Sequence, residues 1–456
     1  MSAGVPPILT PLPIPEPPED CPLSHVGLAV DVGTTTVVVG AWSLRARALL
    51  ATVAEQNRQA RFGSDVVSRI AHAAHSPHGA ADLHGAIVAQ LETLFARALR
   101  MAQAQLPRGI SPVVSRIVVT GNTAMLSLAC GVPVAPLAAA PFRPASLFGM
   151  TVAWGDVRAG TAGGRAMPGE SGRTALGASV IADGTDVYLP PCVSAFVGAD
   201  TVCAMLAAGF PVPAEMSSAA PLLLADIGTN SELALYLPET PRYRSRILCT
   251  SCAAGPAFEA ANISCGMSAV AGAIDLVQDT DGALACRVIG GGRARGICGS
   301  GLVSAVAALR ALGWMDGSGM LCGHSGQQDE GTRAVMLADD VRLTQADVRN
   351  VQLAKSAVRT GLDYLLGMSP SLPTLCLAGA FGTELPLESA AAIGLLPPPL
   401  TGRTVRLGNA ALSGATALLF SLGLRQKCAA LAAASRSLSL AAIPDFQTRF
   451  LHALDF

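Results

Sequence analysis

The sequence predicts an α/β protein made of two related domains, and two observations lead to this prediction. The first is a pattern that occurs twice: an apolar strand ends in Asp-x-Gly-Thr, a tight turn follows, and a second apolar strand begins. The two copies occupy residues 26–43 and 222–237, and their aspartates, Asp31 and Asp226, stand 195 positions apart. The second observation is that helical periodicities alternate with further strands after the first copy. A unit repeated at this separation indicates a duplicated domain.

The residues of both turns have the chemistry of an anion-binding site. Gly33 and Gly228 let backbone N–H groups approach an anion closely, because no Cβ stands in the way. The threonine hydroxyls add donors for phosphoryl oxygens, and the two carboxylates suit magnesium and its waters. One copy alone could equally be an ordinary turn, since turns favour these residue types. Two copies predict two phosphate-binding turns that face each other across a cleft.

The composition predicts a globular protein with large buried cores. The chain has 456 residues, of which 51% are hydrophobic and 14% charged, so extended disorder is not expected. The net charge of −1 gives no sign of a nucleic-acid surface. No charge-free apolar run is long enough to cross a bilayer, and no secretory signal is recognisable. We therefore expect a cytoplasmic protein whose 12 cysteines are mostly reduced.

The first domain is expected over residues 26–210, after a proline-rich tail at residues 1–25. Ser64 and Asp65 are typical caps of a helix that begins near residue 65. Its buried side is expected to carry Val66, Val67 and Ile70. The same periodicities predict a long helix from about residue 80 to 104, a strand at 116–120, a helix at about 123–130 and a helix that ends near 208.

The second domain is expected over residues 211–456. Pro256 fits the first turn of a helix, where its missing N–H does no harm, and the glycine-rich loop before it suits a nucleotide contact. Thr344 is a typical cap of a helix over residues 345–366. The remaining elements are a strand at 244–248, an apolar helix opened by residues 297–301 and ending near 312, a strand at 373–377, helices near 387–394 and 409–421, and a closing segment at 441–456.

Several longer motifs resemble one family. In chain order they are FGSDVVSRI (62–70), VVTGNTAMLSL (118–128), FVGADT (196–201), DIGTNSE (226–232), SCAAGPAFEAANISCGM (251–267), ICGSGL (297–302) and AGAFGTELPLESAAAIGLLP (378–397). Together they resemble the C-terminal ATPase domain of the reductive activators of corrinoid proteins, within the actin, Hsp70 and sugar-kinase (ASKHA) superfamily. The resemblance covers roughly residues 26–456. It implies an α/β fold of duplicated ribonuclease-H-like domains around a nucleotide cleft, and an ATP-driven electron transfer that restores cob(I)amide in a corrinoid protein.

The resemblance also implies site residues, carried over motif by motif. Asp31 and Asp226 would be the catalytic residues and would hold Mg2+ through its waters. The residues that would bind ATP are Gly33, Thr34, Thr35 and Thr36 of the first turn, Gly228, Thr229 and Asn230 of the second turn, and Gly255, Pro256, Glu259, Gly299, Ser300, Gly379, Ala380 and Phe381 of later loops near the nucleoside. The later loops could instead be helix starts with no contact to a ligand.

One feature departs from the family pattern. The known members carry an N-terminal ferredoxin-like domain with a [2Fe-2S] cluster, whereas only Cys21 precedes residue 26 here. We therefore expect no such cluster in this chain and a separate iron–sulfur protein as the electron donor. Cys249-x-x-Cys252, with Cys265 nearby, is the candidate for a cluster elsewhere in the chain. The segment Cys252-Ala-Ala-Gly also resembles the activators of 2-hydroxyacyl-CoA dehydratases, which share one [4Fe-4S] cluster across a dimer. A cluster needs four thiolates, and buried structural thiols are the alternative interpretation.

Four functions stay open at this point. The chain could be an ATP-hydrolysing activator of a corrinoid protein, or a dimeric activator of the dehydratase type. It could be a small-molecule kinase, with Asp65 or Glu55 as the base, or a non-catalytic ATP-gated binding module. The expected partners are a corrinoid protein and a separate iron–sulfur donor, with a homodimer left open and neither nucleic acid nor a membrane expected.

Overall fold

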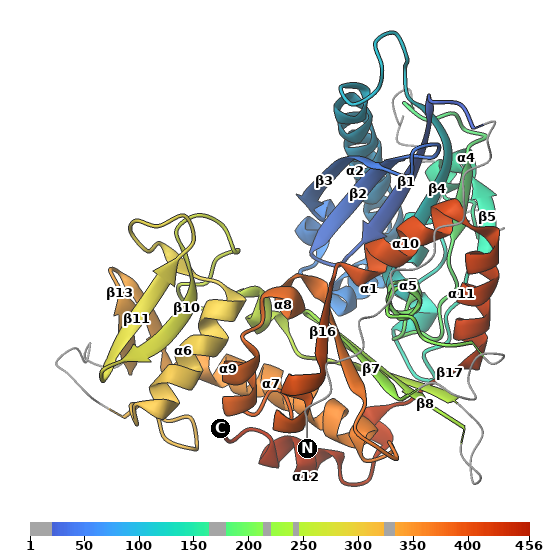
Figure 1. Ribbon diagram of the computed structural model, residues 1–456. Coiled ribbons are helices and arrows are strands. Elements are labelled where there is room, and N and C mark those ends of the chain that lie inside the picture. Colours follow the sequence, from blue (N-terminus) through green and yellow to red (C-terminus); the bar gives the residue numbers. More distant parts are fainter. Residues whose placement is uncertain (1–20, 164–178, 213–219, 240–245, 323–332) are drawn as a thin grey trace. The chain divides into compact units, whose positions relative to one another are not determined.

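The computed structural model describes residues 21–163, 179–212, 220–239, 246–322 and 333–456 (Figure 1). These residues form two compact units, which we call the N-unit and the C-unit. The N-unit contains residues 21–212 together with Asn409–Ser437, and the C-unit contains residues 220–408 together with Leu438–Phe456. Most of the predicted tail, residues 1–20, lies outside the described residues, as do the first two residues of the strand predicted at 244–248.

The N-unit is built on a six-stranded sheet in the order β3-β2-β1-β4-β6-β5. The predicted hairpin is confirmed, because β1 and β2 pair antiparallel, and β3 extends this pairing on the far side of β2. On its other edge β1 pairs parallel with β4, and β4 pairs parallel with β6. The strands are β1 (His25–Val32), β2 (Thr36–Ser43), β3 (Leu49–Gln56), β4 (Val113–Gly121), β5 (Met150–Ala153) and β6 (Asp186–Leu189).

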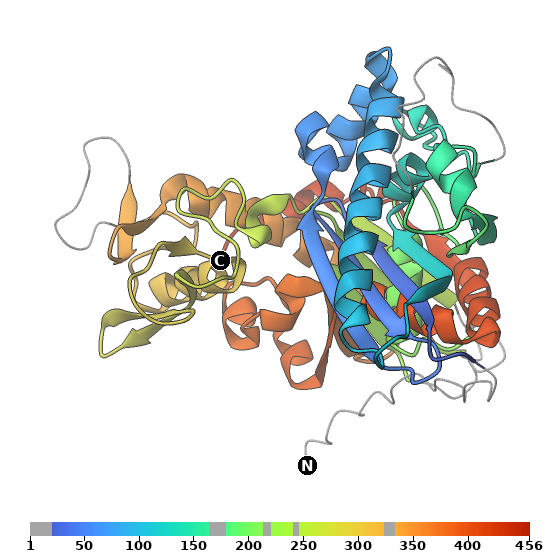
Figure 2. The ribbon, with the colours of Figure 1, turned by 90° about the horizontal axis from the view of Figure 1, so that it is seen from above.

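Helices cover both faces of this sheet (Figures 1 and 2). The long helix α2 packs on β2 and β3, whereas α10 packs on β1, β4 and α5. The helices are α1 (Val66–His75), α2 (Gly79–Gln103), α3 (Thr123–Ala129), α4 (Trp154–Ala159), α5 (Ala199–Ala207), α10 (Ala410–Phe420) and α11 (Leu422–Ala434), with 3-10 turns η1 (Arg58–Phe62) and η2 (Ala135–Leu137).

The start of α1 confirms one local prediction and corrects another. Asp65 accepts a hydrogen bond from the N–H of Ser68, and the Ser68 side chain accepts one from the N–H of Asp65, so the two form a capping box. The prediction that Val67 is buried is wrong, since this side chain is 76% exposed. The buried side of α1 instead carries Arg69 and Ile70. The prediction was wrong because it assigned the buried side of the helix from its apolar residues alone, and a buried arginine does not appear in that pattern.

The segment 409–437 corrects the predicted domain boundary. The sequence assigned it to the second domain, because it follows that domain's elements along the chain. In the structure α10 packs closely on α5 of the N-unit, where a Cβ at Gly414 would lie 2.1 Å from the carbonyl oxygen of Cys203. Only a glycine permits this approach of two helices. The N-unit is therefore discontinuous in sequence.

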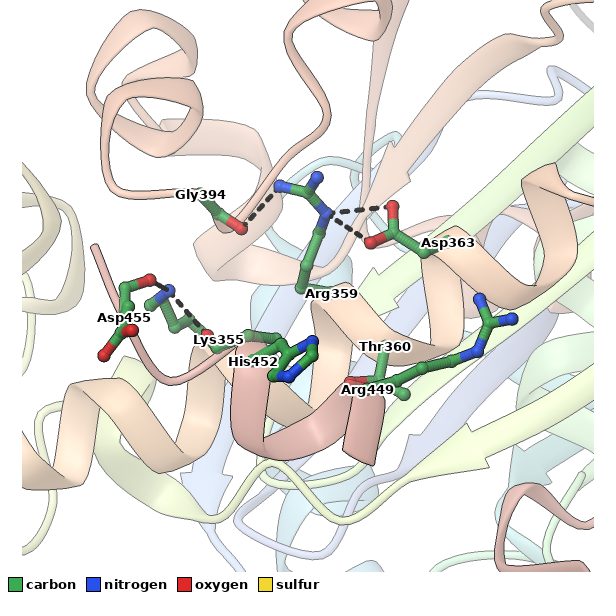
Figure 3. A pocket seen from close by; sticks show the side chains of 9 residues that line it. Lys355, Arg359, Thr360, Asp363, Gly394, Arg449, His452 and Asp455 are labelled. Carbon is green, nitrogen blue, oxygen red and sulfur yellow. Dashed lines mark hydrogen bonds and ion pairs between the residues drawn. The ribbon is translucent and has the colours of Figure 1, made fainter. Parts of the chain in front are cut away.

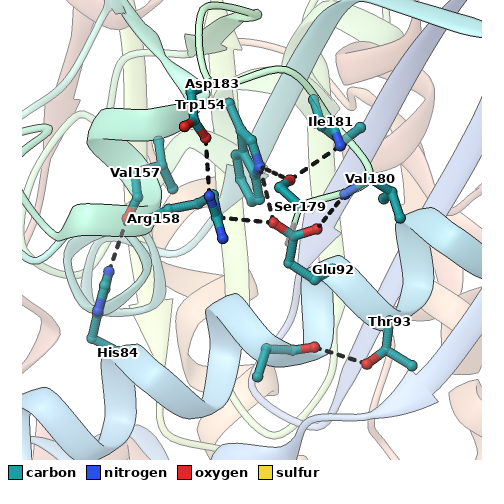
Figure 4. A network of polar contacts seen from close by, with 11 residues as sticks. His84, Glu92, Thr93, Trp154, Val157, Arg158, Ser179, Val180, Ile181 and Asp183 are labelled. Carbon is teal, nitrogen blue, oxygen red and sulfur yellow. Dashed lines mark hydrogen bonds and ion pairs between the residues drawn. The ribbon is translucent and has the colours of Figure 1, made fainter. Parts of the chain in front are cut away.

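A polar network around the buried Trp154 connects α4 with α2 (Figure 4). The indole N–H of Trp154 donates to Glu92 at 3.2 Å and to the hydroxyl of Ser179 at 3.1 Å. Arg158 forms an ion pair with Glu92 at 3.0 Å and another with Asp183 at 3.0 Å. Asp183 is 69% exposed, whereas Arg158 and Glu92 are half-buried, so the charged groups lie at the edge of the core. The network therefore holds the start of residues 179–183 in place beside the sheet.

The C-unit repeats the strand order of the N-unit. β16 (Thr404–Gly408), β15 (Thr374–Ala378), β7 (Leu222–Ile227), β8 (Ser231–Leu237) and β9 (Arg246–Cys252) lie side by side in this order. Along the chain, the antiparallel strands β7, β8 and β9 come first and the parallel strands β15 and β16 follow, as β1, β2 and β3 come before β4 and β6 in the N-unit. β7 thus takes the place of β1. The duplicated ribonuclease-H-like fold class expected from the sequence is confirmed by this correspondence.

The C-unit adds elements that the sequence did not predict. The main addition is a small sheet of β10 (Ala273–Thr280), β11 (Ala283–Val288) and β12 (Gly296–Ile297), against which α6 packs (Figure 1). A further hairpin joins β13 (Ala334–Ala338) and β14 (Val341–Thr344). The remaining helices and 3-10 turns of the C-unit, some of which the sequence did predict, are α6 (Gly299–Ala311), α7 (Gln345–Leu366), α8 (Gly379–Glu384), α9 (Leu387–Ala392), α12 (Phe446–His452), η4 (Pro256–Glu259), η5 (Pro398–Arg403) and η6 (Leu440–Ala442).

Two of the predicted helix starts have different outcomes in the C-unit. α7 begins and ends where the sequence predicted, because Thr344 and Asp347 form a capping box at its start. The helix predicted at Pro256 is only a four-residue 3-10 turn, η4. Among the helices that the structure describes, none is both long enough and apolar enough to span a bilayer.

Candidate functional site

The first Asp-x-Gly-Thr turn lies between β1 and β2 of the N-unit. The N–H of Gly33 donates to the carbonyl oxygen of Thr36 at 3.0 Å, which closes the turn. Thr35 and Thr36 are exposed, whereas Gly33 and Thr34 are half-buried. The exposed threonines leave this side of the turn accessible to a ligand.

Three side chains from other elements hold the first turn in shape. Asn57 donates to the carbonyl oxygen of Gly33 at 2.8 Å, and Asn122 donates to the hydroxyl of Thr34 at 3.1 Å. The fully buried guanidinium of Arg69 donates to the carbonyl oxygen of Thr34 at 2.7 Å. Burial lowers the pKa of Arg69 to about 10, with the charge of nearby Asp65 acting in the opposite direction. A buried positive charge therefore lies directly behind the first turn.

Asp31 lies at the end of β1, next to two residues that the sequence did not single out. Burial raises the pKa of Asp31 to about 6, although Asn409 donates to its carboxylate at 2.9 Å and so favours the ionised form. Asp200, at the start of α5, is close enough for the two negative charges to interact. Burial, and then the charge of Asp31, raise the pKa of Asp200. The N-unit thus holds two interacting carboxylates beside its turn.

The second turn lies between β7 and β8 of the C-unit, and a carboxylate holds it. Glu259 Oε1 accepts hydrogen bonds from both the N–H and the hydroxyl of Thr229, each at 2.8 Å. The N–H of Gly255 donates to the carbonyl oxygen of Thr229 at 2.8 Å. Glu259 and Gly255 were predicted to lie near the nucleoside, whereas here they contact the turn itself. Both donors of the Thr229 residue therefore point to one carboxylate oxygen.

Asp226 lies at the end of β7, directly beside the corner between β15 and α8. β7 and β15 pair parallel, so that Ala378 stands opposite Asp226. Gly379 follows with φ +84°, and a Cβ on it would lie 2.7 Å from Asp226 Oδ1. Both the backbone angle and the space therefore require glycine here. Two residues predicted for different parts of the site, 153 positions apart, are thus neighbours.

The later loops meet behind the second turn. The rings of Phe258 and Phe381 stack with centroids 4.8 Å apart, and Gly299 lies against the carbonyl of Phe258. Phe381 is 9% exposed and Ser300 is 7% exposed, so both are packed inside the C-unit. The Ser300 hydroxyl lies 3.3 Å from the sulfur of Cys298. Of the predicted residues not yet placed, Ala380 is exposed, and Asn230 and Pro256 are half-buried.

The cysteines of the C-x-x-C segment lie on β9. Side chains three residues apart on a strand point to opposite faces of the sheet, so Cys249 and Cys252 cannot ligate one metal centre together in this arrangement. Cys252 packs against Gly361 in the core, where burial raises the pKa of its thiol. Within the described ranges, no three His, Cys, Asp or Glu side chains gather closely enough to hold a metal ion.

Five contributors to the site were missed by sequence reasoning: Asn57, Arg69, Asn122, Asp200 and Asn409. Arg69, Asn122 and Asp200 belong to the motifs FGSDVVSRI, VVTGNTAMLSL and FVGADT, which carried the resemblance without an assigned role. Buried polar residues next to a predicted turn are a signal that could have found them. Asn409 carries no such local signal, because it reaches Asp31 from 378 positions away.

Comparison with known proteins places this chain in a family. Two family patterns match the chain: the C-terminal domain of RACo, the ASKHA domain, at residues 220–456, and the RACo middle region at residues 26–162. The corrinoid activation enzyme RamQ of Eubacterium limosum is 30% identical over 449 residues, which cover 93% of this chain and 69% of RamQ. The [Co(II) methylated amine-specific corrinoid protein] reductase of Methanosarcina barkeri is 29% identical over 260 residues, 51% of this chain and 44% of the reductase.

A solved structure supports the same relationship. The reductive activator for corrinoid, iron–sulfur protein superposes with a TM-score of 0.77 at 29% identity. The superposition covers 95% of this chain and 66% of the solved one, so this chain spans about two thirds of that activator's length. The chain therefore belongs to the RACo family, the reductive activators of corrinoid proteins.

Proposed function

We propose that this chain is an ATP-hydrolysing reductive activator that restores cob(I)amide in a corrinoid protein. The observation that carries the proposal is the second turn, where the two donors of Thr229 converge on one carboxylate oxygen beside Asp226. The N-unit supports it with a matching turn beside Asp31. The relatives named as a corrinoid activation enzyme and a corrinoid protein reductase indicate the class of partner.

The residues present fit a magnesium-bound ATP. The Thr229 donors hold the Glu259 oxygen at 2.8 Å, which is the arrangement that a phosphoryl oxygen requires. Mg2+ keeps several waters and binds through one or two carboxylates together with substrate phosphates, which suits Asp31 and Asp226. When bound, the ion would neutralise the charge that develops on the phosphoryl group.

The residues of the two turns would act by positioning and by proton transfer. Thr34 and Thr229 donate to phosphoryl oxygens, while Asp31 and Asp226 orient the attacking water. The pKa of Asp31 is raised to about 6, so its carboxylate accepts a proton from this water more readily than an ordinary aspartate does. Differential affinity for the corrinoid protein before and after hydrolysis would couple the two reactions.

The electron would come from a separate iron–sulfur protein. One electron from this donor would reduce Co(II) of the corrinoid to Co(I), while ATP and water would give ADP and phosphate. Hydrolysis supplies the free energy that this unfavourable transfer lacks. The thiols Cys249 and Cys252 are buried in the C-unit, which disfavours the alternative of a shared cluster at this segment.

The two candidate bases of the kinase alternative are both engaged in structural contacts. Burial opposes ionisation of Asp65, but the hydrogen bonds from Ser68 outweigh it, and the pKa of this cap is lowered. Glu55 forms an ion pair with Arg58 at 2.8 Å. A carboxylate with a lowered pKa is a weak general base. Neither residue therefore favours transfer of phosphate to a metabolite.

The test is to measure released phosphate and ADP with the corrinoid protein and a reduced iron–sulfur donor present. We expect equal amounts of the two products, and a loss of about 100-fold or more for Asp226→Ala with the fold retained. The exposed Asp82→Asn is the matched control and should behave as wild type. Phosphate found on a metabolite would contradict the proposal and indicate a small-molecule kinase. Nucleotide that binds but is not hydrolysed would contradict it and indicate a non-catalytic binding module.

A further inference from the structure

A cavity of about 310 Å3 lies in the C-unit, away from the residues assigned to the nucleotide (Figure 3). Its wall is formed by α7, by α12 with the residues that follow it, and by Gly394 after α9. Four of its side chains are cationic or can become so, against two carboxylates, Asp363 and Asp455. These four are Lys355, Arg359, Arg449 and His452. Arg449 is also ion-paired with Asp445, at 2.6 Å and outside the wall, so the excess of potential positive charge at the cavity is small.

Lys355 is the most deeply buried of these groups. It is 1% exposed, and its ammonium donates to the carbonyl oxygens of Ala453 at 2.7 Å and Asp455 at 2.5 Å. Burial and the positive charge of Arg359 lower the pKa of Lys355 to about 8, while Asp455 opposes them. An ammonium has three donors, of which the carbonyls take two. A buried cation is costly unless it is paired, so an anion in the cavity would stabilise its charged form.

Arg359 is fixed in a position from which it can donate further hydrogen bonds. Its Nε donates to both oxygens of Asp363, at 2.9 and 2.8 Å, and its Nη1 donates to the carbonyl of Gly394 at 3.1 Å. A guanidinium has five N–H donors, so these contacts leave three for a ligand. Figure 3 shows Arg449 and His452, both from α12, on the same wall as Thr360.

Thr360 gives evidence that does not depend on charge. Its side chain lines the cavity and the residue is 2% exposed. In the part of the chain that the structure describes, its buried hydroxyl has no hydrogen-bond partner. Buried hydroxyl groups are normally satisfied, so one without a partner at a cavity wall indicates a missing acceptor.

We propose that this cavity binds a phosphate group, either free or carried by a small molecule. Lys355, Arg359 and Arg449 supply charge-assisted donors, and Thr360 supplies a neutral one. A phosphate group offers three or more acceptor oxygens to donors that arrive from several directions, whereas a carboxylate offers two. The proposal does not depend on the nucleotide at the two turns, since none of the lining residues belongs to them.

The test is the thermal stability of the full chain with inorganic phosphate and, separately, with glycerol 2-phosphate. Binding to the folded state raises Tm, and we expect a rise of about 2 °C or more at saturation. Thr360→Val, which removes the hydroxyl at nearly constant volume, and Arg449→Gln should each abolish most of this rise. Arg287→Gln, an exposed arginine ion-paired with Asp275 elsewhere in the C-unit, is the matched control and should keep it.

Phosphate could also bind at the second turn, and Thr229→Val separates the two sites because it alters only that turn. A rise that Thr229→Val keeps and Thr360→Val loses supports the cavity. A larger effect of glycerol 2-phosphate at equal concentration would mean a phosphorylated small molecule, and equal effects would mean free phosphate. The proposal is overturned if neither compound raises Tm, or if the rise persists in Thr360→Val and Arg449→Gln.

Discussion

Glu259 holds Thr229 by accepting two hydrogen bonds at a single carboxylate oxygen, one from the backbone N–H and one from the hydroxyl, both 2.8 Å long. Under the proposed function, a phosphoryl oxygen of bound nucleotide would use the same two donors. Glu259 would then compete with the nucleotide for the second turn. Any nucleotide that binds to this turn has to displace a negative charge.

Replacing Glu259 by glutamine should strengthen nucleotide binding. The amide can still accept a hydrogen bond from Thr229, but its bond is weaker and it does not repel phosphate. We expect the Kd for ATP, measured by calorimetry, to fall by about 5-fold, which corresponds to about 1 kcal/mol. Glu388→Gln, an exposed residue of α9, is the control and should leave the Kd unchanged. Weaker binding by the Glu259 variant would show that the carboxylate supports the nucleotide.

Gly379→Ala should damage both stability and nucleotide binding. A Cβ there would lie 2.7 Å from Asp226 Oδ1, on a backbone with φ +84° that alanine rarely adopts. We expect a loss of about 1–3 kcal/mol in the free energy of unfolding by urea, and impaired ATP binding. Gly402→Ala is the matched control, because a Cβ at Gly402 meets nothing within 4 Å. Equal stability of the two variants would contradict the contact between Gly379 and Asp226.

The stability of Asp31→Asn should differ from wild type in a pH-dependent way. Burial raises the pKa of Asp31 from 3.8 to about 6, so the folded state holds its proton more tightly than the unfolded state does. The stability that this carboxyl contributes is present below pH 3.8 and is lost as the pH rises through 6. At pH 8 the variant should therefore be more stable than wild type, by at most about 3 kcal/mol, and the difference should vanish near pH 4. Urea unfolding at the two pH values measures it, and an equal difference at both would contradict the shift.

Arg69→Lys should loosen the first turn. The guanidinium donates at once to the carbonyl oxygens of Gly63 and Thr34, at 2.9 and 2.7 Å, and a lysine cannot reproduce this fork. We expect a loss of about 2 kcal/mol in unfolding free energy and faster amide exchange around the turn. Arg61→Lys is the control, since Arg61 lies over the ring of Phe62 at the surface. Unchanged exchange at Thr34 and Thr35 would rule out this role of Arg69.

The elements that the sequence predicted well depend on nearby residues. The capping boxes of α1 and α7 are made by residues three positions apart, and both hairpins are closed by turns of three residues. Strand alternation and turn chemistry were therefore enough to find both turns and their aspartates. The close approach of Gly379 to Asp226 was not predicted, because it depends on the parallel pairing of β15 with β7.

The parts that the sequence did not predict depend on packing between distant segments. Asn409 reaches Asp31 because α10 returns to the N-unit, and nothing in the residues around 409 indicates this return. Asp200 contributes to the site because α5 begins near the end of β1, so that the charges of Asp200 and Asp31 interact. The contact of Glu259 with Thr229 was not predicted, because it depends on how the 3-10 turn η4 directs this side chain.

The most direct test of the central claim is the rate of Co(I) formation under anaerobic conditions, followed by absorbance. The assay contains the corrinoid protein in its Co(II) state, a reduced iron–sulfur donor and this chain. The account predicts that Co(I) forms only when ATP is present, and that Asp226→Asn lowers the rate by about 100-fold or more without unfolding the chain. Co(I) formation at the same rate without ATP, or with the Asp226→Asn chain, would contradict it.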